Sequence, residues 1–236
     1  MYDDSREAMK TPNDLQAVLL CGGKGERLRP LTADLPKPLV PIKGKPILGY
    51  VVGHARKHAI KDFIVAVGYK AGKIKRYLER ELKIKAALVD SGDVDIIKRI
   101  VGCAPHIKGD FIVMYGDTLS DVNLKELARF HRGRPEPVTI TVWPLRSPFG
   151  VLEVTDDGQI LSFKEKPLLD RWINIGYFYF EREALAWMKD FEHFEDFLHH
   201  LVTKGKMNAF RHTGIHITVN THQELREAER NIGRVS

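Results

Sequence analysis

The chain of 236 residues contains only two cysteines, Cys21 and Cys103, and no long hydrophobic run. Two isolated cysteines provide neither a disulfide framework nor the closely spaced ligands of a zinc site, which is typical of proteins in a reducing cytosol. No apolar run approaches the roughly 20 residues that a membrane-spanning helix needs. We therefore expect a cytoplasmic protein with no membrane partner.

The first residues also lack the apolar core of a signal peptide, because they are polar and mixed in charge. We expect residues 1–14 to form a short flexible extension. No internal repeat, low-complexity stretch or clear linker divides the remainder. Residues 15–236 are therefore predicted to form a single domain with two halves, about 15–135 and about 136–236.

The net charge of +6 suits polyanionic ligands such as nucleic acid, acidic lipid or nucleotide phosphates. The lysines and arginines are spread along the chain. Their densest cluster, residues 70–85, is interleaved with acids at helical spacing, as on a solvated helix face. We therefore expect no nucleic-acid partner.

In the first half, short apolar runs alternate with helical patterns. The predicted strands are 17–21, 62–67, 84–89 and 110–115, and the predicted helices are 46–59, 71–82, 94–104 and 123–131. Strands that are apolar throughout are typical of a parallel sheet covered on both faces. This pattern predicts an α/β fold with a three-layer, Rossmann-like, mostly parallel sheet.

After Pro137 the pattern becomes more mixed. Predicted strands are 138–143, 151–154, 160–163, 173–180 and 215–219, and predicted helices are 182–190, 194–204 and 221–232. The sequence Asp156-Asp157-Gly158 between two of these strands is typical of a hairpin turn. We expect this half to form an antiparallel lobe.

A glycine-rich loop directly follows the first strand. Gly22, Gly23 and Gly25 let the backbone approach a ligand closely, and their N–H groups can form a nest for an anion. Lys24 and Arg27 add positive charge at the same place. The spacing matches neither the P-loop nor the dinucleotide pattern.

Further along, Pro36 and Pro38 stiffen the backbone around Lys37 and suit it to aim a charge at phosphate. With these features the segment 20–47 resembles the signature of the nucleoside-diphosphate-sugar pyrophosphorylases, the sugar-1-phosphate nucleotidyltransferases. The resemblance implies a nucleotide-diphospho-sugar transferase fold, with Arg27 and Lys37 as catalytic residues. The predicted nucleotide-binding residues are Leu20, Cys21, Gly22, Gly23, Lys24, Gly25, Arg27, Lys37, Gly92 and Asp117.

Two residues are predicted to bind Mg²⁺. Asp117 ends the fourth strand, at the sheet edge where ligands bind in open α/β folds, although a turn aspartate is an alternative. The family's second metal ligand precedes the last helix, where this chain has Asn220. The alternative for Asn220 is an N-cap of that helix.

The resemblance also implies an acceptor site for a sugar phosphate. The matching residues are Gly150, Glu165, Lys166 and Asn174. In contrast, the segment 90–97 departs from the family's base-holding sequence and retains only Gly92. The layout is most like that of the glucose-1-phosphate cytidylyltransferases, which favours CTP as the nucleoside triphosphate.

The expected reaction is Mg²⁺-dependent nucleotidyl transfer from a nucleoside triphosphate to a sugar 1-phosphate, giving a nucleoside-diphosphate sugar and pyrophosphate. One alternative is another triphosphate or another phosphorylated acceptor, such as a heptose, inositol, choline or phosphonate. An alternative of a different class is a non-catalytic regulatory homologue. The oligomeric state is left open, with a homo-oligomer among the alternatives.

Overall fold

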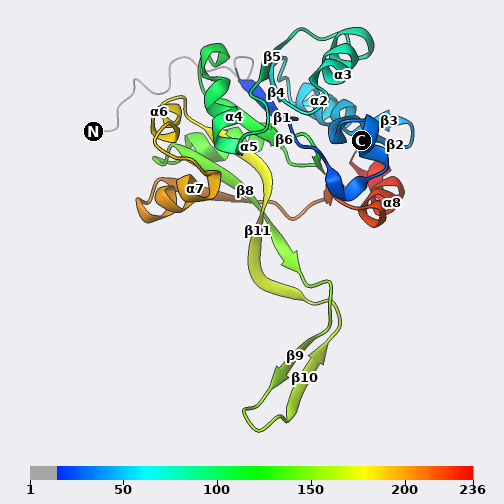
Figure 1. Cartoon of the computed structure of the whole chain (residues 1–236). Coiled ribbons are helices and arrows are strands. Elements are labelled where there is room, and N and C mark those ends of the chain that lie inside the picture. The colour runs from blue at the N-terminus through cyan, green and yellow to red at the C-terminus, as the bar shows by residue number, and fades with distance from the viewer. Residues whose placement is uncertain (1–14, 236) are drawn as a thin grey trace.

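The computed structural model describes residues 15–235, in which helices cover both faces of a central sheet (Figure 1). The expected flexible extension, residues 1–14, lies outside the described residues. Within the described part, no helix is long and apolar enough to cross a membrane.

The central sheet has seven strands in the order β12-β8-β11-β6-β1-β4-β5. These are β1 (Gln16–Leu20), β4 (Asp62–Val67), β5 (Ala86–Asp90), β6 (Phe111–Tyr115), β8 (Val138–Arg146), β11 (Leu168–Phe180) and β12 (Met207–Arg211). β1 pairs in parallel with β4 and β6, and only β11 runs against its two neighbours. The carboxyl ends of β1 and β6, Leu20 and Tyr115, therefore lie side by side.

Alternate side chains of each strand supply the cores on the two faces. In β1, Ala17 and Leu19 belong to one core, whereas Val18 belongs to the other. The first core is covered by α2 (Ile47–Lys57), α3 (Ala71–Arg76), α5 (Leu124–Arg132) and α8 (His222–Asn231), and the second by α4 (Ile96–Gly102), α6 (Ala184–Met188) and α7 (Phe194–Thr203). The predicted three-layer α/β fold with a mostly parallel sheet is confirmed.

The second half is less antiparallel than the sequence predicts. β8 and β12 pair in parallel and continue the direction of β6, so β11 alone is reversed in the main sheet. The sequence does not predict β12, because its short segment Met-Asn-Ala-Phe-Arg mixes polar and apolar residues and lies at a sheet edge.

Beyond their paired ends, β8 and β11 continue into an extension that we call the arm, residues 147–167. The predicted hairpin is present there: β9 (Val151–Val154) pairs antiparallel with β10 (Ile160–Lys164) around a turn with Gly158 at φ +89°. Figure 1 shows this hairpin projecting away from the three layers. We call the rest of the described chain the body.

Two small antiparallel pairs lie beside the main sheet. β7 (Thr118–Ser120) pairs with β13 (His216–Thr218), and β2 (Pro41–Ile42) pairs with β3 (Lys45–Pro46). The pairing of β7 with β13 brings the residues after β13 next to those before β7. The short helical segments are η3 (Glu26–Leu28), α1 (Leu31–Asp34), η4 (Lys37–Leu39), η5 (Tyr77–Glu81), η6 (Ala104–His106) and η7 (Ile232–Arg234).

Candidate functional site

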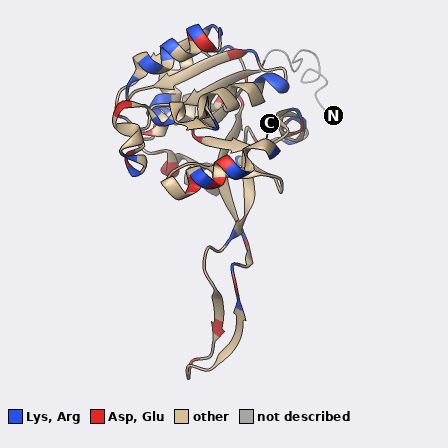
Figure 2. Ribbon diagram, turned by 90° about the vertical axis from the view of Figure 1, so that its right-hand side faces the viewer, with Lys and Arg blue, Asp and Glu red and all other residues tan. Residues whose placement is uncertain are grey.

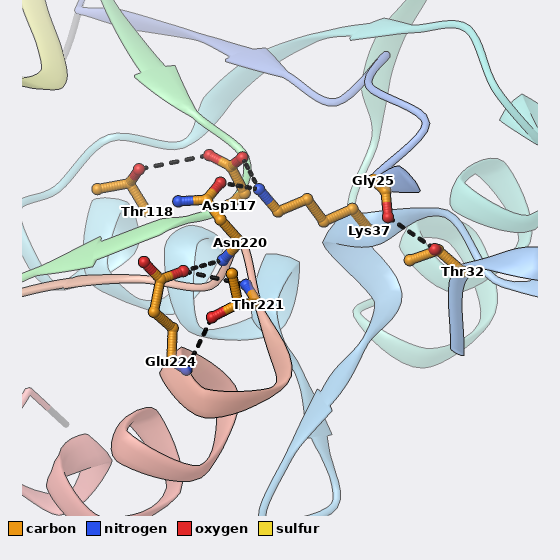
Figure 3. Close-up of polar contacts among 8 residues, drawn as sticks. All are labelled: Gly25, Thr32, Lys37, Asp117, Thr118, Asn220, Thr221 and Glu224. Carbon is orange, nitrogen blue, oxygen red and sulfur yellow. Dashed lines mark hydrogen bonds and ion pairs between the residues drawn. The ribbon is translucent and has the colours of Figure 1, made fainter. Parts of the chain in front are cut away.

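Three residues from distant parts of the sequence meet at the carboxyl end of β6. Lys37 donates to Asp117, with Nζ 2.5 Å from Oδ2, and also to Asn220, with Nζ 2.7 Å from Oδ1 (Figure 3). The Lys37 residue is only 8% exposed, whereas the Asp117 side chain is 33% exposed. The carboxylate therefore remains open to a ligand while the ammonium group lies behind it.

The fold holds each of these side chains through its backbone. Lys37 begins η4 between two prolines, and Asp117 lies between β6 and β7. Asn220 follows β13, and its N–H donates to Oε2 of Glu224 at 2.5 Å. The N-cap of α8 is Thr221, which forms a capping box with Glu224. The alternative interpretation of Asn220 as the N-cap is therefore wrong.

The donor set at this point suits a magnesium ion. Asp117 Oδ2 and Asn220 Oδ1 converge on one cationic nitrogen, so both oxygens already face the same position. Mg²⁺ binds oxygen ligands and in phosphate sites needs only one or two from the protein. Among residues 15–235 no group of three or more His, Cys, Asp or Glu side chains could hold a metal. Phosphate and water would have to supply the remaining ligands.

The glycine loop lies next to this cluster. Gly25 has φ +67°, and an ideal Cβ there would lie 2.9 Å from Cβ of Lys37, so a side chain at this position would push Lys37 away. Thr32 Oγ1 donates to the Gly25 carbonyl at 2.7 Å and holds the turn. Within the described chain, the N–H groups of residues 22–25 have no hydrogen-bond acceptor. They can therefore bind an anion.

The two cations of the loop differ in their surroundings. Arg27 is exposed and forms no hydrogen bond or ion pair with residues 15–235, so its guanidinium is available to a ligand. Lys24 instead pairs with Asp93, with Nζ 2.5 Å from Oδ2, and this bond raises the pKa of Lys24. This salt bridge therefore connects the glycine loop to the segment 90–97, which departs from the family's base-holding sequence.

The first two residues predicted to bind nucleotide already use part of their backbone within the sheet. The Leu20 carbonyl accepts from the N–H of Gly116, and the Cys21 N–H donates to the Ala66 carbonyl. The Cys21 side chain is fully buried, and this burial raises the pKa of its thiol. The residues that follow, 22–25, have N–H groups without an acceptor in the described chain.

The structure adds a residue that the sequence analysis missed. Arg99 of α4 is only 7% exposed, and its Nε donates to the Val94 carbonyl at 3.0 Å. Its Nη1 is buried and has no hydrogen-bond partner. An ideal Cβ on Gly22 would lie 1.2 Å from this atom, so the guanidinium rests against the glycine loop.

Arg99 was overlooked because an arginine in a helix next to Lys98 is usually solvated. A usable indication was its spacing, four residues before the apolar Cys103, which is the C-cap of α4, because this spacing places both residues on the same side of the helix. A buried arginine donor without a partner is costly, so its retention beside the loop suggests a ligand.

The predicted acceptor residues are divided between body and arm. Asn174 of β11 lies in the body, where its Oδ1 accepts from the Gly176 N–H at 2.8 Å. Burial raises the pKa of the nearby Tyr115 to about 12. Gly150, Glu165 and Lys166 lie in the arm.

Within the arm these three residues are neighbours or nearly so. An ideal Cβ on Gly150 would lie 3.2 Å from Oε2 of Glu165. The Lys166 carbonyl accepts from Nη1 of Arg146 at 3.1 Å, at the base of the arm. No hydrogen bond or ion pair in the described chain links Glu165 or Lys166 to the Lys37 cluster.

The chain is similar to known proteins over most of its length. The model of the family described as "Nucleotidyl transferase" matches residues 16–216. A probable glucose-1-phosphate cytidylyltransferase of Bacillus subtilis (strain 168) is 33% identical over 243 residues, covering 92% of this chain and 95% of the relative. Glucose-1-phosphate cytidylyltransferase of Salmonella typhi is 32% identical, covering 85% and 89%.

A solved structure with a similar fold is a putative glucose-1-phosphate thymidylyltransferase from Bacillus anthracis in complex with a sucrose. Its TM-score is 0.76 at 18% identity, with 92% of this chain and 94% of that chain covered. At this identity the likeness shows the fold alone.

The chain belongs to the nucleotidyl transferase family. Within that family it is an enzyme of the sugar-1-phosphate nucleotidyltransferase class.

Proposed function

We propose that this enzyme transfers a cytidylyl group from CTP to a sugar 1-phosphate with the help of Mg²⁺, releasing pyrophosphate. The observation that carries the proposal is the cluster of Lys37, Asp117 and Asn220 beside a loop of unpaired N–H groups. Such a site offers positive charge, anion-binding donors and metal-binding oxygens within one small region.

In this reaction an oxygen of the sugar phosphate attacks the α-phosphorus of the triphosphate, and pyrophosphate leaves in line. The attacking phosphate is already ionised, so no general base is required. The protein's contribution is positioning and charge stabilisation. The loop N–H groups and Arg27 hold the phosphates, and Lys37 counters the negative charge that develops.

Asp117 and Asn220 would hold the magnesium ion. Bound there, it would neutralise phosphate charge and orient the reacting groups. Because Lys37 contacts the same two oxygens without a ligand, it has to turn toward phosphate when the site fills.

Similarity and Arg99 both support CTP as the nucleotide. The relatives with the stated identities are named cytidylyltransferases, although other matched relatives are named uridylyl- and guanylyltransferases. The guanidinium of Arg99 offers only donors. It matches the adjacent acceptors O2 and N3 of cytosine, whereas N3 of uracil carries a hydrogen and is itself a donor.

Pyrophosphate release from CTP, UTP, GTP, ATP and dTTP with a set of sugar 1-phosphates, inositol phosphate and phosphocholine tests the proposal. We expect the fastest turnover with CTP and a hexose 1-phosphate, and loss of turnover with a chelator. Arg27→Ala should lower kcat by about 100-fold, the order seen when one charge-stabilising donor is removed. Arg80→Ala, an exposed arginine in the η5 segment, is the matched control.

The same panel separates the alternatives. If another pair of substrates gives the fastest turnover, that pair replaces CTP or the hexose phosphate in the proposal. The proposed nucleotidyl transfer is then retained. No metal-dependent pyrophosphate release with any pair contradicts the proposed activity and favours a non-catalytic homologue.

A further inference from the structure

One exposed tryptophan lies on β11 beside the predicted acceptor residue Asn174. Trp172 is 40% exposed, whereas every other Phe, Tyr and Trp that the structure describes in the body is buried or half-buried. Trp143, for comparison, is half-buried and donates from Nε1 to the Gly214 carbonyl at 2.9 Å. A single exposed ring does not define a site, so its neighbours decide what it could bind.

Trp172 and Asn174 face the same side of the main sheet. Successive residues of a strand face opposite sides, and in β11 Ile173 packs against the first core while Phe178 belongs to the second. The even-numbered residues therefore face the side of α4 and α7. The pairing of β11 with β8 is regular from Trp172 to Asn174, so their Cα atoms lie about 7 Å apart.

The register also places both residues at the substrate edge of the sheet. β11 runs against β6, and Tyr177 pairs with Met114. Counting back along β11 therefore brings Asn174 level with the end of β6, which Asp117 follows. Trp172 lies one step further out on the same face. A sugar with a hydroxyl group on Asn174 would have the indole beside its ring.

A second residue of this face contacts the indole. Arg211 of β12 pairs with Val142 of β8, which in turn pairs with Asn174, so the three lie in one row across the sheet. The guanidinium carbon of Arg211 lies 5.2 Å from the centre of the Trp172 ring, within the range of a cation–π contact. The Arg211 side chain is exposed and forms no ion pair with residues 15–235. It is therefore free to hold the indole in a fixed orientation.

The charged part of an acceptor finds its binding groups next to this row. Figure 2 shows basic segments where the arm joins the body. There Nη1 of Arg146 donates to the Lys166 carbonyl at 3.1 Å, and β11 begins two residues later, at Leu168. The acceptor phosphate would thus lie toward Lys166 and the uncharged ring toward Trp172. An aromatic face beside a few polar groups is the usual composition of a small-molecule site.

We propose that Trp172 stacks on the ring of the acceptor and that Arg211 is a positioning residue for the indole. The inference rests on the proposed function, because it uses the acceptor role of Asn174. It narrows the substrate class to phosphorylated acceptors with a ring, since an acyclic acceptor such as phosphocholine has no ring face to cover the indole.

Steady-state kinetics test the stacking. Trp172→Ala should raise KM for glucose 1-phosphate about tenfold while kcat and KM for the triphosphate stay unchanged. Trp172→Phe keeps an aromatic face and should recover most of the loss. Val202→Ala, which changes another exposed apolar residue of the body, is the control. An unchanged KM in Trp172→Ala, or a wild-type enzyme that prefers phosphocholine to every sugar 1-phosphate, overturns the proposal.

A double-mutant cycle tests the positioning role of Arg211. Arg211→Gln should raise KM for glucose 1-phosphate by about two- to fivefold, the order of an exposed cation–π contact. In the Trp172→Ala background the same change should have no further effect, because the indole that Arg211 holds is gone. Equal factors in the two backgrounds would show that Arg211 acts independently of Trp172 and remove its positioning role.

A binding measurement separates this inference from the proposed function. Saturation-transfer NMR with irradiation of aromatic protons detects sugar protons next to an aromatic ring without turnover. The probe is glucose 1-phosphate, alone and with the α,β-methylene analogue of CTP. We expect transfer to the ring protons in the wild type and in Arg27→Ala, and little in Trp172→Ala.

The two failures then differ. Transfer that depends on Trp172 in a protein that releases no pyrophosphate contradicts the activity and retains the ring contact. An active enzyme with equal transfer in the wild type and Trp172→Ala, or with none in the wild type, retains the activity and overturns the stacking.

Discussion

At the residue scale, the ammonium group of Lys37 contacts oxygens of both Asp117 and Asn220, so one cation holds together the two side chains that are proposed to bind the metal. The sequence singles out Lys37, Asp117 and Asn220, and the structure brings all three together. The prediction of these three residues succeeds because the resemblance rests on motifs at defined strand ends. Arg99 was missed because its importance depends on contact with Gly22, which is remote in sequence.

Asn220 allows a direct test of the metal site. Asn220→Asp keeps the shape of the side chain and adds a negative charge, so we expect Mg²⁺ affinity to be kept or raised. Asn220→Ala should weaken it. A calorimetric titration with Mg²⁺ in the presence of CTP measures the metal affinity of both variants. If the alanine variant binds the metal as the wild type does, Asn220 is not a ligand.

Arg99 allows a test of base selection. Arg99→Leu removes the unpaired donor beside Gly22 and should lower kcat/KM for CTP by about 10- to 100-fold, which is about 1–3 kcal/mol. The value for UTP should fall less. Lys98→Leu is the matched control, because Lys98 points outward and pairs with Glu192 at 2.7 Å. An unchanged ratio of CTP to UTP activity in Arg99→Leu contradicts base reading by this residue.

At the element scale, the strands that are buried on both faces were predicted correctly. β1, β4 and β6 are continuous apolar runs, and the structure places them in the middle of the sheet. β12 lies at an edge and has no such run. The projection of the arm could not be predicted either, since an apolar and polar alternation specifies a hairpin but not what its apolar face contacts.

The capping box of α8 links an element to the site. Thr221 Oγ1 accepts from the Glu224 N–H, and the Glu224 carboxylate accepts from the Asn220 N–H. Thr221→Ala should cost about 1 kcal/mol, or about 2–4 °C in Tm for a domain of this size. It should also weaken metal binding, because Asn220 loses part of its support. Thr203→Ala, at the end of α7, is the control.

The measurements for Thr221 are a thermal melt and the same Mg²⁺ titration. A lower Tm with unchanged metal affinity would mean that the capping box stabilises the helix without positioning Asn220. A titration midpoint that shifts together with Tm supports the coupling.

At the scale of the whole molecule, two histidines, of which one is buried and one half-buried, connect folding to pH. His54 lies in α2 and donates to the Val122 carbonyl at 2.9 Å, and His216 lies in β13. Burial lowers the pKa of each from 6.5 to about 4, with a smaller contribution from His58 and His212, respectively. Both are therefore neutral in the folded protein at pH 7.

This shift predicts that stability falls as the solution is acidified. Between pH 6.5 and about 4 the unfolded chain binds protons at these histidines while the folded chain does not, so the free energy of unfolding decreases through this window. For His54 the shift corresponds to about 3 kcal/mol once the pH is below both values. Urea unfolding at pH 7, 6, 5 and 4.5 measures the decrease. His54→Gln keeps a donor near Val122 and cannot titrate, so its curve should be flatter than that of the wild type. Equal slopes in the two proteins would assign the acid sensitivity to other groups and remove His54 from the explanation.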